Sequence, residues 1–201
     1  MSRGLIVLDP GHGPTGNRFT ILTDFYEGTQ MWHLGQFLRD ELIARGFDVM
    51  LTRPNLEDNP SLAERGEMAG KHGAIMFLSL HSNAPGMMKD PEAYAAVNGA
   101  ETFYSVTDPA RNIPIAEALT AAAVSTMQTG CRGIKTRLYP DRPDLDYYGV
   151  IRAAATSGCP QAFLIEQGFH TNPHDSAFLA DLDCLRQLAK AEAEAISACF
   201  A

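Results

Sequence analysis

The sequence predicts an α/β domain, residues 1–201, built on a mainly parallel twisted sheet with helices on both faces. Short, continuous apolar runs at residues 5–8, 74–80 and 161–165 are typical of strands that are buried on both sides, as in a parallel sheet. Segments whose apolar residues recur at helical spacing separate these runs. No repeat or linker is visible, so we expect one domain with a single core.

The first strand is followed by a turn, a helix and a second strand. The strand at residues 5–8 breaks at Asp9. There, Pro10 and two glycines form a tight turn that carries His12 away from the strand end. A helix follows and ends near Gly46. Its apolar stripe consists of Met31, Leu34, Leu38 and Leu42. The alternation of apolar residues after the helix, at Phe47, Val49 and Leu51, is typical of a second strand.

The middle of the chain adds a helix and two more strands. Residues 61–64 match a capping box, which predicts the start of a helix that closes near Gly73. The apolar strand at 74–80 comes next. Residues 85–99 have no clear period, and we expect a long loop or a short local helix there. Alternation at residues 101–106 predicts another strand.

The last third of the chain contains two helices, a long loop and two strands. The first helix has an apolar stripe made of Ile115, Leu119, Ala122 and Met127. Residues 133–148 are charged and rich in tyrosine and are expected to form a loop, and residues 150–151 begin a short strand. The apolar strand at 161–165 follows. Residues 172–175 look like a helix cap with proline at the first helical position, and a long helix covers 182–199.

Composition excludes several classes of function. The formal net charge is -8 at pH 7 with a pI near 5.2, and no cluster of Lys and Arg stands out, so we expect no nucleic-acid partner. No apolar run approaches the roughly 18 residues of a membrane span. Residues 1–4 lead directly into the first strand, and we expect no signal peptide in this chain. The cysteines are widely spaced and are expected to be free thiols: Cys131, Cys159, Cys184 and Cys199.

Four potential ligands or acids fall where the fold would bring them together. His12, His81 and Glu166 each follow an apolar strand, and Glu27 lies in the first turn of the first helix, on the stripe that faces the sheet. Because the carboxyl ends of parallel strands share one edge of a sheet, these side chains are expected to converge. Two imidazoles and one carboxylate, with a position left open for water, form a ligand set of catalytic zinc, and a further carboxylate can act as an acid or base.

Four segments in this order carry a family resemblance. They are residues 8–13 (LDPGHG), Glu27 at a helix start, residues 79–84 (SLHSNA), and residues 164–169 (LIEQGF) followed by 171–173 (TNP). Together they resemble the zinc-dependent N-acetylmuramoyl-L-alanine amidases of the amidase-3 type, and the resemblance spans nearly the whole chain.

The resemblance implies one zinc per chain, bound by His12, Glu27 and His81, with Glu166 as the catalytic residue. It also implies the reaction, hydrolysis of the amide between N-acetylmuramic acid and the L-alanine of the stem peptide. The partners would then be the glycan and the stem peptide of peptidoglycan. The place of action would be the cell wall, outside the cytoplasm, as in an autolysin or endolysin. The route of export stays open.

Two alternatives use the same residues. A zinc peptidase or deacylase could act on another amide with His12, Glu27, His81 and Glu166. A catalytically silent wall-binding domain could retain the fold, but it would have no use for Glu166.

Further residues are candidates for substrate binding. Arg53 ends its strand at the ligand edge, where it could meet a substrate carboxylate or pair with an internal Asp or Glu. Asn83 could contact substrate or orient the neighbouring histidine. His170 stands where the family resemblance leads us to expect an aliphatic residue, and it could reach the cleft.

The two long segments without a clear period, residues 85–99 and 133–148, are expected to wall a groove over the site, because long structureless loops in compact domains are usually functional. The second segment supplies candidates for stacking on sugar or peptide, or for binding a stem-peptide carboxylate: Tyr147, Tyr148, Arg137 and Arg142. The alternative for the two tyrosines is that they cover the sheet.

Overall fold

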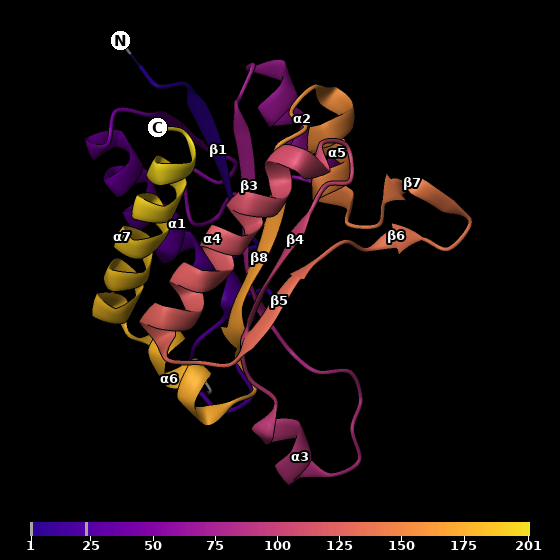
Figure 1. Ribbon diagram of the computed structural model, residues 1–201. Coiled ribbons are helices and arrows are strands. Elements are labelled where there is room, and N and C mark those ends of the chain that lie inside the picture. Colours follow the sequence, from indigo (N-terminus) through magenta and orange to yellow (C-terminus); the bar gives the residue numbers. More distant parts are fainter. Residues whose placement is uncertain (1, 23) are drawn as a thin grey trace.

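The computed structural model describes residues 2–22 and 24–201, and a six-stranded twisted sheet forms its centre (Figure 1). The strand order is β2-β1-β3-β8-β4-β5. The bounds are β1 Leu5–Pro10, β2 Asp48–Leu51, β3 Met76–Asn83, β4 Ala100–Tyr104, β5 Cys131–Lys135 and β8 Ala162–Phe169. Neighbouring strands pair in parallel except β4 and β8, which are antiparallel. The predicted α/β class with a mainly parallel sheet is confirmed.

Helices cover both faces of the sheet. One face carries α1 (Glu27–Ala44), α4 (Pro109–Met127) and α7 (Leu182–Cys199). The other carries α2 (Leu62–Lys71) and α5 (Gly149–Ser157). The remaining elements are α3 (Pro91–Ala96), α6 (Pro173–Ala180) and the hairpin of β6 (Leu138–Tyr139) and β7 (Arg142–Asp146), which projects away from the sheet (Figure 1). None of the helices in residues 2–22 and 24–201 is long and apolar enough to cross a membrane.

The alternation of side chains along the central strands explains the two-sided core. In β1, Ile6 and Leu8 join the cluster under α1 and α7, whereas Val7 points into the cluster under α2 and α5. All three side chains have no exposed surface, and neither do the four predicted stripe residues of α1. The continuous apolar run of β1 therefore belongs to a strand buried on both faces, as predicted.

The predicted strand at Val150 and Ile151 is wrong, because these residues belong to α5. Together with Ala154 they form the buried face of that helix, which packs against α2. The packing is close. A Cβ atom on Gly66 of α2 would lie 2.4 Å from the Val150 carbonyl oxygen, so only glycine fits there. Two adjacent β-branched residues suggested a strand, but the small residues that follow them allow a helix.

The predicted loop at residues 133–148 is wrong in part. It contains the end of β5 and the hairpin of β6 and β7. Most hairpin side chains are exposed or half-buried, so no buried face leaves an apolar pattern in the sequence. The segment at residues 85–99 holds the short helix α3, one of the two forms expected for it.

A buried acid on α7, Glu192, is expected to make the stability of the folded chain depend on pH. Glu192 has no exposed surface, and its Oε1 accepts a hydrogen bond of 2.6 Å from Gln167 Nε2. Burial raises the pKa of Glu192 to about 8. Glu192 Oε2 and Gln167 Oε1, both acceptors when Glu192 is ionised, have no partner among the described residues. These observations fit a Glu192 that is protonated in the folded chain at neutral pH.

We therefore expect Glu192→Gln to change how stability depends on pH. Between the ordinary glutamate pKa near 4.5 and the folded value of about 8, the folded wild-type chain binds more protons than the unfolded chain. Its stability accordingly falls as pH rises through this window, by up to about 1.4 kcal/mol per pH unit. The neutral variant lacks this loss, so its Tm relative to wild type should rise by several degrees from pH 5 to pH 8.

Thermal unfolding at both pH values measures this effect. The matched control is Glu117→Gln, which changes an exposed glutamate of α4 and should keep the wild-type pH dependence. A difference between Glu192→Gln and wild type that stays constant with pH would contradict a protonated Glu192.

Candidate functional site

The turn after β1 holds His12 against the end of β3. His12 has a left-handed backbone with φ of 58°, and the Gly11 N–H donates to the Leu80 carbonyl oxygen at 2.9 Å. A Cβ atom on Gly11 would lie 2.4 Å from the His81 ring. At Gly28, in the first turn of α1, a Cβ atom would lie 1.8 Å from the Gly13 carbonyl oxygen. These glycines let the turn, the helix start and His81 lie in direct contact.

Glu27 is the centre of the arrangement. It opens α1 and has no exposed surface. Its Oε1 accepts a hydrogen bond of 2.8 Å from the Ser82 backbone N–H and lies 3.0 Å from His81 Nδ1 and 3.4 Å from His12 Nε2. Its Oε2 accepts a hydrogen bond of 2.9 Å from Asn17 Nδ2. Four neighbouring groups therefore surround the carboxylate.

The donor atoms of His12, Glu27 and His81 all lie within 4.8 Å of one another. Burial raises the pKa of Glu27, but hydrogen bonds to the two imidazoles outweigh burial and keep the pKa below its ordinary range. The hydrogen bond to Glu27 in turn raises the pKa of His12. A buried carboxylate is stabilised by positive charge beside it, and two nitrogens with one oxygen are donors that suit a divalent transition metal. The residues fit the predicted ligand set.

Glu166 lies next to this cluster, within β8. It pairs in register with His81 of β3, and the strand continues to Phe169, beyond the end that the sequence suggested. Glu166 Oε2 is buried and has no hydrogen-bond partner in the part of the chain that the structure describes. Burial, followed by the nearby carboxylates of Glu27 and Glu101, raises the pKa of Glu166 well above its ordinary value.

His170 does not line the cleft as expected. It is 4% exposed and stacks on Phe19 with 5.5 Å between the ring centroids. Its Nδ1 lies 2.9 Å from Ser82 Oγ and 3.9 Å from Glu27 Oε2, and burial lowers its pKa. His170 therefore lies behind the carboxylate of Glu27, and its contact with substrate stays a prediction.

Arg53 is also placed differently from both expectations. Its side chain is fully buried and donates to main-chain carbonyl oxygens, not to a carboxylate. The acceptors belong to Gly11, Gly28, Leu56 and Asp58. Arg53 thus ties the His12 turn to α1 and to the segment after β2.

Asn83 and the two tyrosines have distinct surroundings. Asn83 is half-buried, and its Nδ2 donates to Glu101 Oε1 at 2.8 Å, so it orients a carboxylate instead of His81. Tyr148 packs on Phe103 with 4.8 Å between ring centroids, and burial followed by the nearby Glu166 carboxylate raises its pKa. Tyr147 is 41% exposed. Tyr148 is therefore the closer of the two tyrosines to the site.

The hairpin arginines are engaged with neighbours on the hairpin or near it. Arg142 pairs with Asp144, and the Arg137 guanidinium lies over Tyr147, with 4.0 Å between its Cζ and the ring centroid.

A buried ion pair that the sequence analysis did not identify holds the first turn in place. Asp9 is 1% exposed and accepts hydrogen bonds from Thr52, Ser79 and Arg65. Arg65 also donates to the carbonyl oxygen of His12 at 2.7 Å. The sequence contains one sign of this pair, because Asp9 ends a buried strand and a buried carboxylate requires a partner. That partner, Arg65, lies 56 residues away in the sequence.

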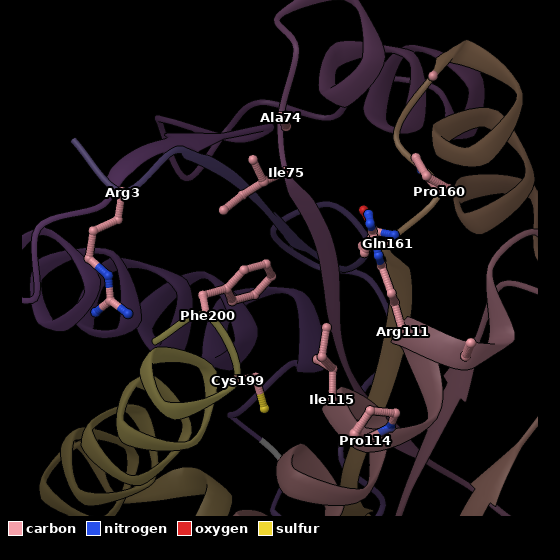
Figure 2. Close-up of a pocket in the computed structure, with 12 residues that line it drawn as sticks. Arg3, Ala74, Ile75, Arg111, Pro114, Ile115, Pro160, Gln161, Cys199 and Phe200 are labelled. Carbon is pink, nitrogen blue, oxygen red and sulfur yellow. The ribbon is translucent and has the colours of Figure 1, made fainter. Parts of the chain in front are cut away.

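A cavity of about 490 Å³ opens beside the two imidazoles. His12 and His81 line it together with residues 59–62, Arg65 and Val150. The wall on this side is the start of α2, which the sequence predicts as a helix start but not as part of a cavity, and neither of the two long segments lines it. A larger cavity, about 710 Å³, lies at the amino edge of the sheet, where Arg111, Gln161 and Phe200 surround it (Figure 2). It is separate from the imidazoles.

A family model described as N-acetylmuramoyl-L-alanine amidase matches residues 6–198. The chain belongs to this amidase family. The predicted resemblance is therefore confirmed. Among curated relatives, the amidase LytC of Bacillus subtilis is 30% identical over 135 residues, which are 67% of this chain and 25% of LytC. The chain thus spans about a quarter of that relative.

Solved structures of two amidases and of the protein Cwp6 share the fold. The catalytic domain of CwlV from Bacillus (Paenibacillus) polymyxa is 25% identical with a TM-score of 0.77, and the match covers 98% of this chain and 97% of that domain. AmiC2 of Nostoc punctiforme is 27% identical with a TM-score of 0.77, covering 97% and 96%. Cwp6 from Clostridium difficile has a TM-score of 0.83 at 24% identity, covering 96% of this chain and 28% of Cwp6. The amidase-family chain thus matches the catalytic domain of CwlV along nearly its full length.

Proposed function

We propose that this amidase-family chain, residues 1–201, is a catalytic domain that binds one zinc and hydrolyses the amide between N-acetylmuramic acid and L-alanine in peptidoglycan. The observation that carries the proposal is that the donor atoms of His12, Glu27 and His81 lie within 4.8 Å of one another. Glu166 pairs in register with His81 and so lies next to this set. Family membership supports the substrate class. The substrate lies in the cell wall, so we expect the domain to act outside the cytoplasm on the glycan and the stem peptide.

His12 Nε2, a Glu27 carboxylate oxygen and His81 Nδ1 would hold the metal. When bound, zinc supplies a Lewis acid that polarises a carbonyl and acidifies water. Two features of the chain keep the donors in place without the metal. The Ser82 backbone N–H and Asn17 hold the Glu27 carboxylate, and glycines let the His12 turn lie against His81. His170 closes the buried side of Glu27.

Glu166 would move the proton. The pKa of Glu166 is raised from the ordinary glutamate value toward neutral pH. A pKa near the working pH suits a group that must both accept and release a proton. As a carboxylate it can take a proton from the attacking water, and as a carboxylic acid it can give that proton to the nitrogen of the departing L-alanine. The in-register pairing of Glu166 with His81 supports this role. A silent wall-binding domain would not need this group.

Metal analysis tests the ligand set. We expect the purified protein to contain close to one zinc per chain, and His12→Ala, Glu27→Ala and His81→Ala each to lose most of it together with activity. The matched control is His174→Ala, since the His174 side chain is 60% exposed and lies outside the cluster. Stoichiometric zinc in the His12→Ala/His81→Ala double variant would rule out this set.

Product analysis tests the reaction. Mass spectrometry of fragments released from purified peptidoglycan should show stem peptides with a free L-alanine amino group and glycans with a free lactyl carboxyl group. A chelator should abolish release, and added zinc should restore it. Cleavage inside the stem peptide, or loss of acetyl groups, would instead support the peptidase or deacylase alternative.

A further inference from the structure

A cluster of charged residues lies on the far side of Glu166 from the proposed metal centre. At its middle is Glu101 of β4, whose side chain is 5% exposed. Arg132 Nε lies 3.4 Å from Glu101 Oε2, and Lys135 Nζ contacts the same oxygen. The other oxygen accepts the hydrogen bond from Asn83. The two cations of β5 are 37% and 40% exposed, so a single buried carboxylate is flanked by two cations that solvent can still reach.

The sheet places this cluster in line with the catalytic groups. His81 pairs in register with Glu166, and Glu166 pairs in register with Glu101, so these three side chains form a row on one face across β3, β8 and β4. Lys135 of β5 pairs with Phe103, which lies two residues after Glu101 and therefore on the same face. Figure 1 shows β8, β4 and β5 side by side in this order.

This row gives the proposed reaction a direction. The scissile carbonyl must lie near His12, Glu27 and His81, and the departing nitrogen must lie near Glu166. The stem peptide extends from that nitrogen, and the row of side chains beyond Glu166 leads toward β4 and β5. Two strand spacings separate β5 from β8, which amounts to about 10 Å. An extended peptide covers about 3.4 Å per residue, so the second stem residue lies part of the way across this distance. Long side chains on β5 can span the remainder.

We propose that Arg132 and Lys135 bind a free carboxylate on the second residue of the stem peptide. The proposal rests on the proposed function. The Arg132 Nη groups have no acceptor among residues 2–22 and 24–201, and its Cζ lies 4.9 Å from the centroid of the Phe169 ring, which supports the guanidinium from one side. Glu101 offers one oxygen to the two cations, which leaves an excess positive charge for an anion of the substrate.

Two synthetic muramoyl tripeptides that differ only at the second residue, with a free carboxylate in one and a carboxamide in the other, test the proposal. Zinc-loaded wild type should cut the carboxylate substrate with a kcat/KM about tenfold higher, mainly through a lower KM, as expected for a charge-assisted contact of about 1.4 kcal/mol. Arg132→Gln and Lys135→Gln should reduce this preference toward one, because they lower kcat/KM for the carboxylate substrate far more than for the carboxamide substrate. Lys71→Gln, an exposed lysine of α2, is the matched control and should keep the preference.

The outcomes separate this inference from the proposed function. If wild type cuts both tripeptides equally well, the carboxylate site is overturned while the amidase function stands. An equal loss of kcat/KM on both substrates in Arg132→Gln and Lys135→Gln would also overturn it, since the cations would then act on the structure of the site. If zinc-loaded wild type cuts neither substrate nor intact peptidoglycan, the proposed function fails and this inference fails with it.

Discussion

Glu166→Gln is expected to lower the rate of amide hydrolysis by about 100-fold or more, while the protein keeps its fold and its zinc. Glutamine has nearly the same size as glutamate but cannot take a proton from water or pass one to the leaving nitrogen. Glu166 lies outside the donor set of His12, Glu27 and His81, so its replacement should leave the metal in place. The variant also removes a buried acid whose Oε2 has no partner among the described residues, so stability should not fall much.

Three measurements on the same preparation check this expectation: kcat on a muramoyl peptide, zinc per chain, and thermal unfolding. Glu117→Gln on the exposed side of α4 serves as the control for the loss of one glutamate. If the Glu166→Gln variant loses zinc along with its activity, Glu166 is a ligand and the proposed division of roles is incorrect.

Arg65→Met should destabilise the folded protein by about 3–5 kcal/mol, because it leaves the buried charge of Asp9 without its cation. The Arg65 side chain is 3% exposed, and its Nη1 lies 2.9 Å from Asp9 Oδ1. Methionine fills part of the same space but donates no hydrogen bond. The substitution also releases the carbonyl oxygens of Pro10 and His12, so the turn that carries the first imidazole loses its support from α2.

Denaturant unfolding with a chelator present measures this effect, since bound zinc would add its own stabilisation to the folded state. The matched control is Lys71→Met, which removes an exposed cation from the same helix and should cost less than about 1 kcal/mol. A loss of similar size in both variants would show that the Asp9–Arg65 pair contributes no more than a surface pair.

The central part of the fold could be predicted because its sequence pattern has one interpretation. In β1, β3 and β8, continuous apolar runs require burial on both faces, and all three strands were predicted. The capping box at Ser61 and Glu64 marks the start of α2, and both of its hydrogen bonds are present. The clustering of His12 and His81 followed from the rule that parallel strands end at the same edge, and that of Glu27 from its place in the first turn of the helix that returns from this edge.

The remaining differences between the expectations and the structure have a common physical origin. For Arg53 and His170, the partners are main-chain carbonyls, a neighbouring hydroxyl and an aromatic ring from distant turns, and such partners leave no periodic pattern in the sequence. For α5, the strand was predicted from the two adjacent β-branched residues Val150 and Ile151, although the alanines that follow them favour a helix. The α2–α5 contact that decides the matter depends on Gly66, which is far away in the sequence.

The antiparallel pairing of β4 with β8 has a consequence for how this domain can diversify. Because β4 runs against β8, its first residues lie at the edge that holds Glu166, with Glu101 opposite it. The segment at residues 84–99 therefore leaves the end of β3 and returns to that same edge, so both of its anchors are set by the sheet. Insertions or deletions there cross no part of the core and cost little loop entropy. This one segment can thus be lengthened, shortened or exchanged while the sheet and the donor set stay unchanged.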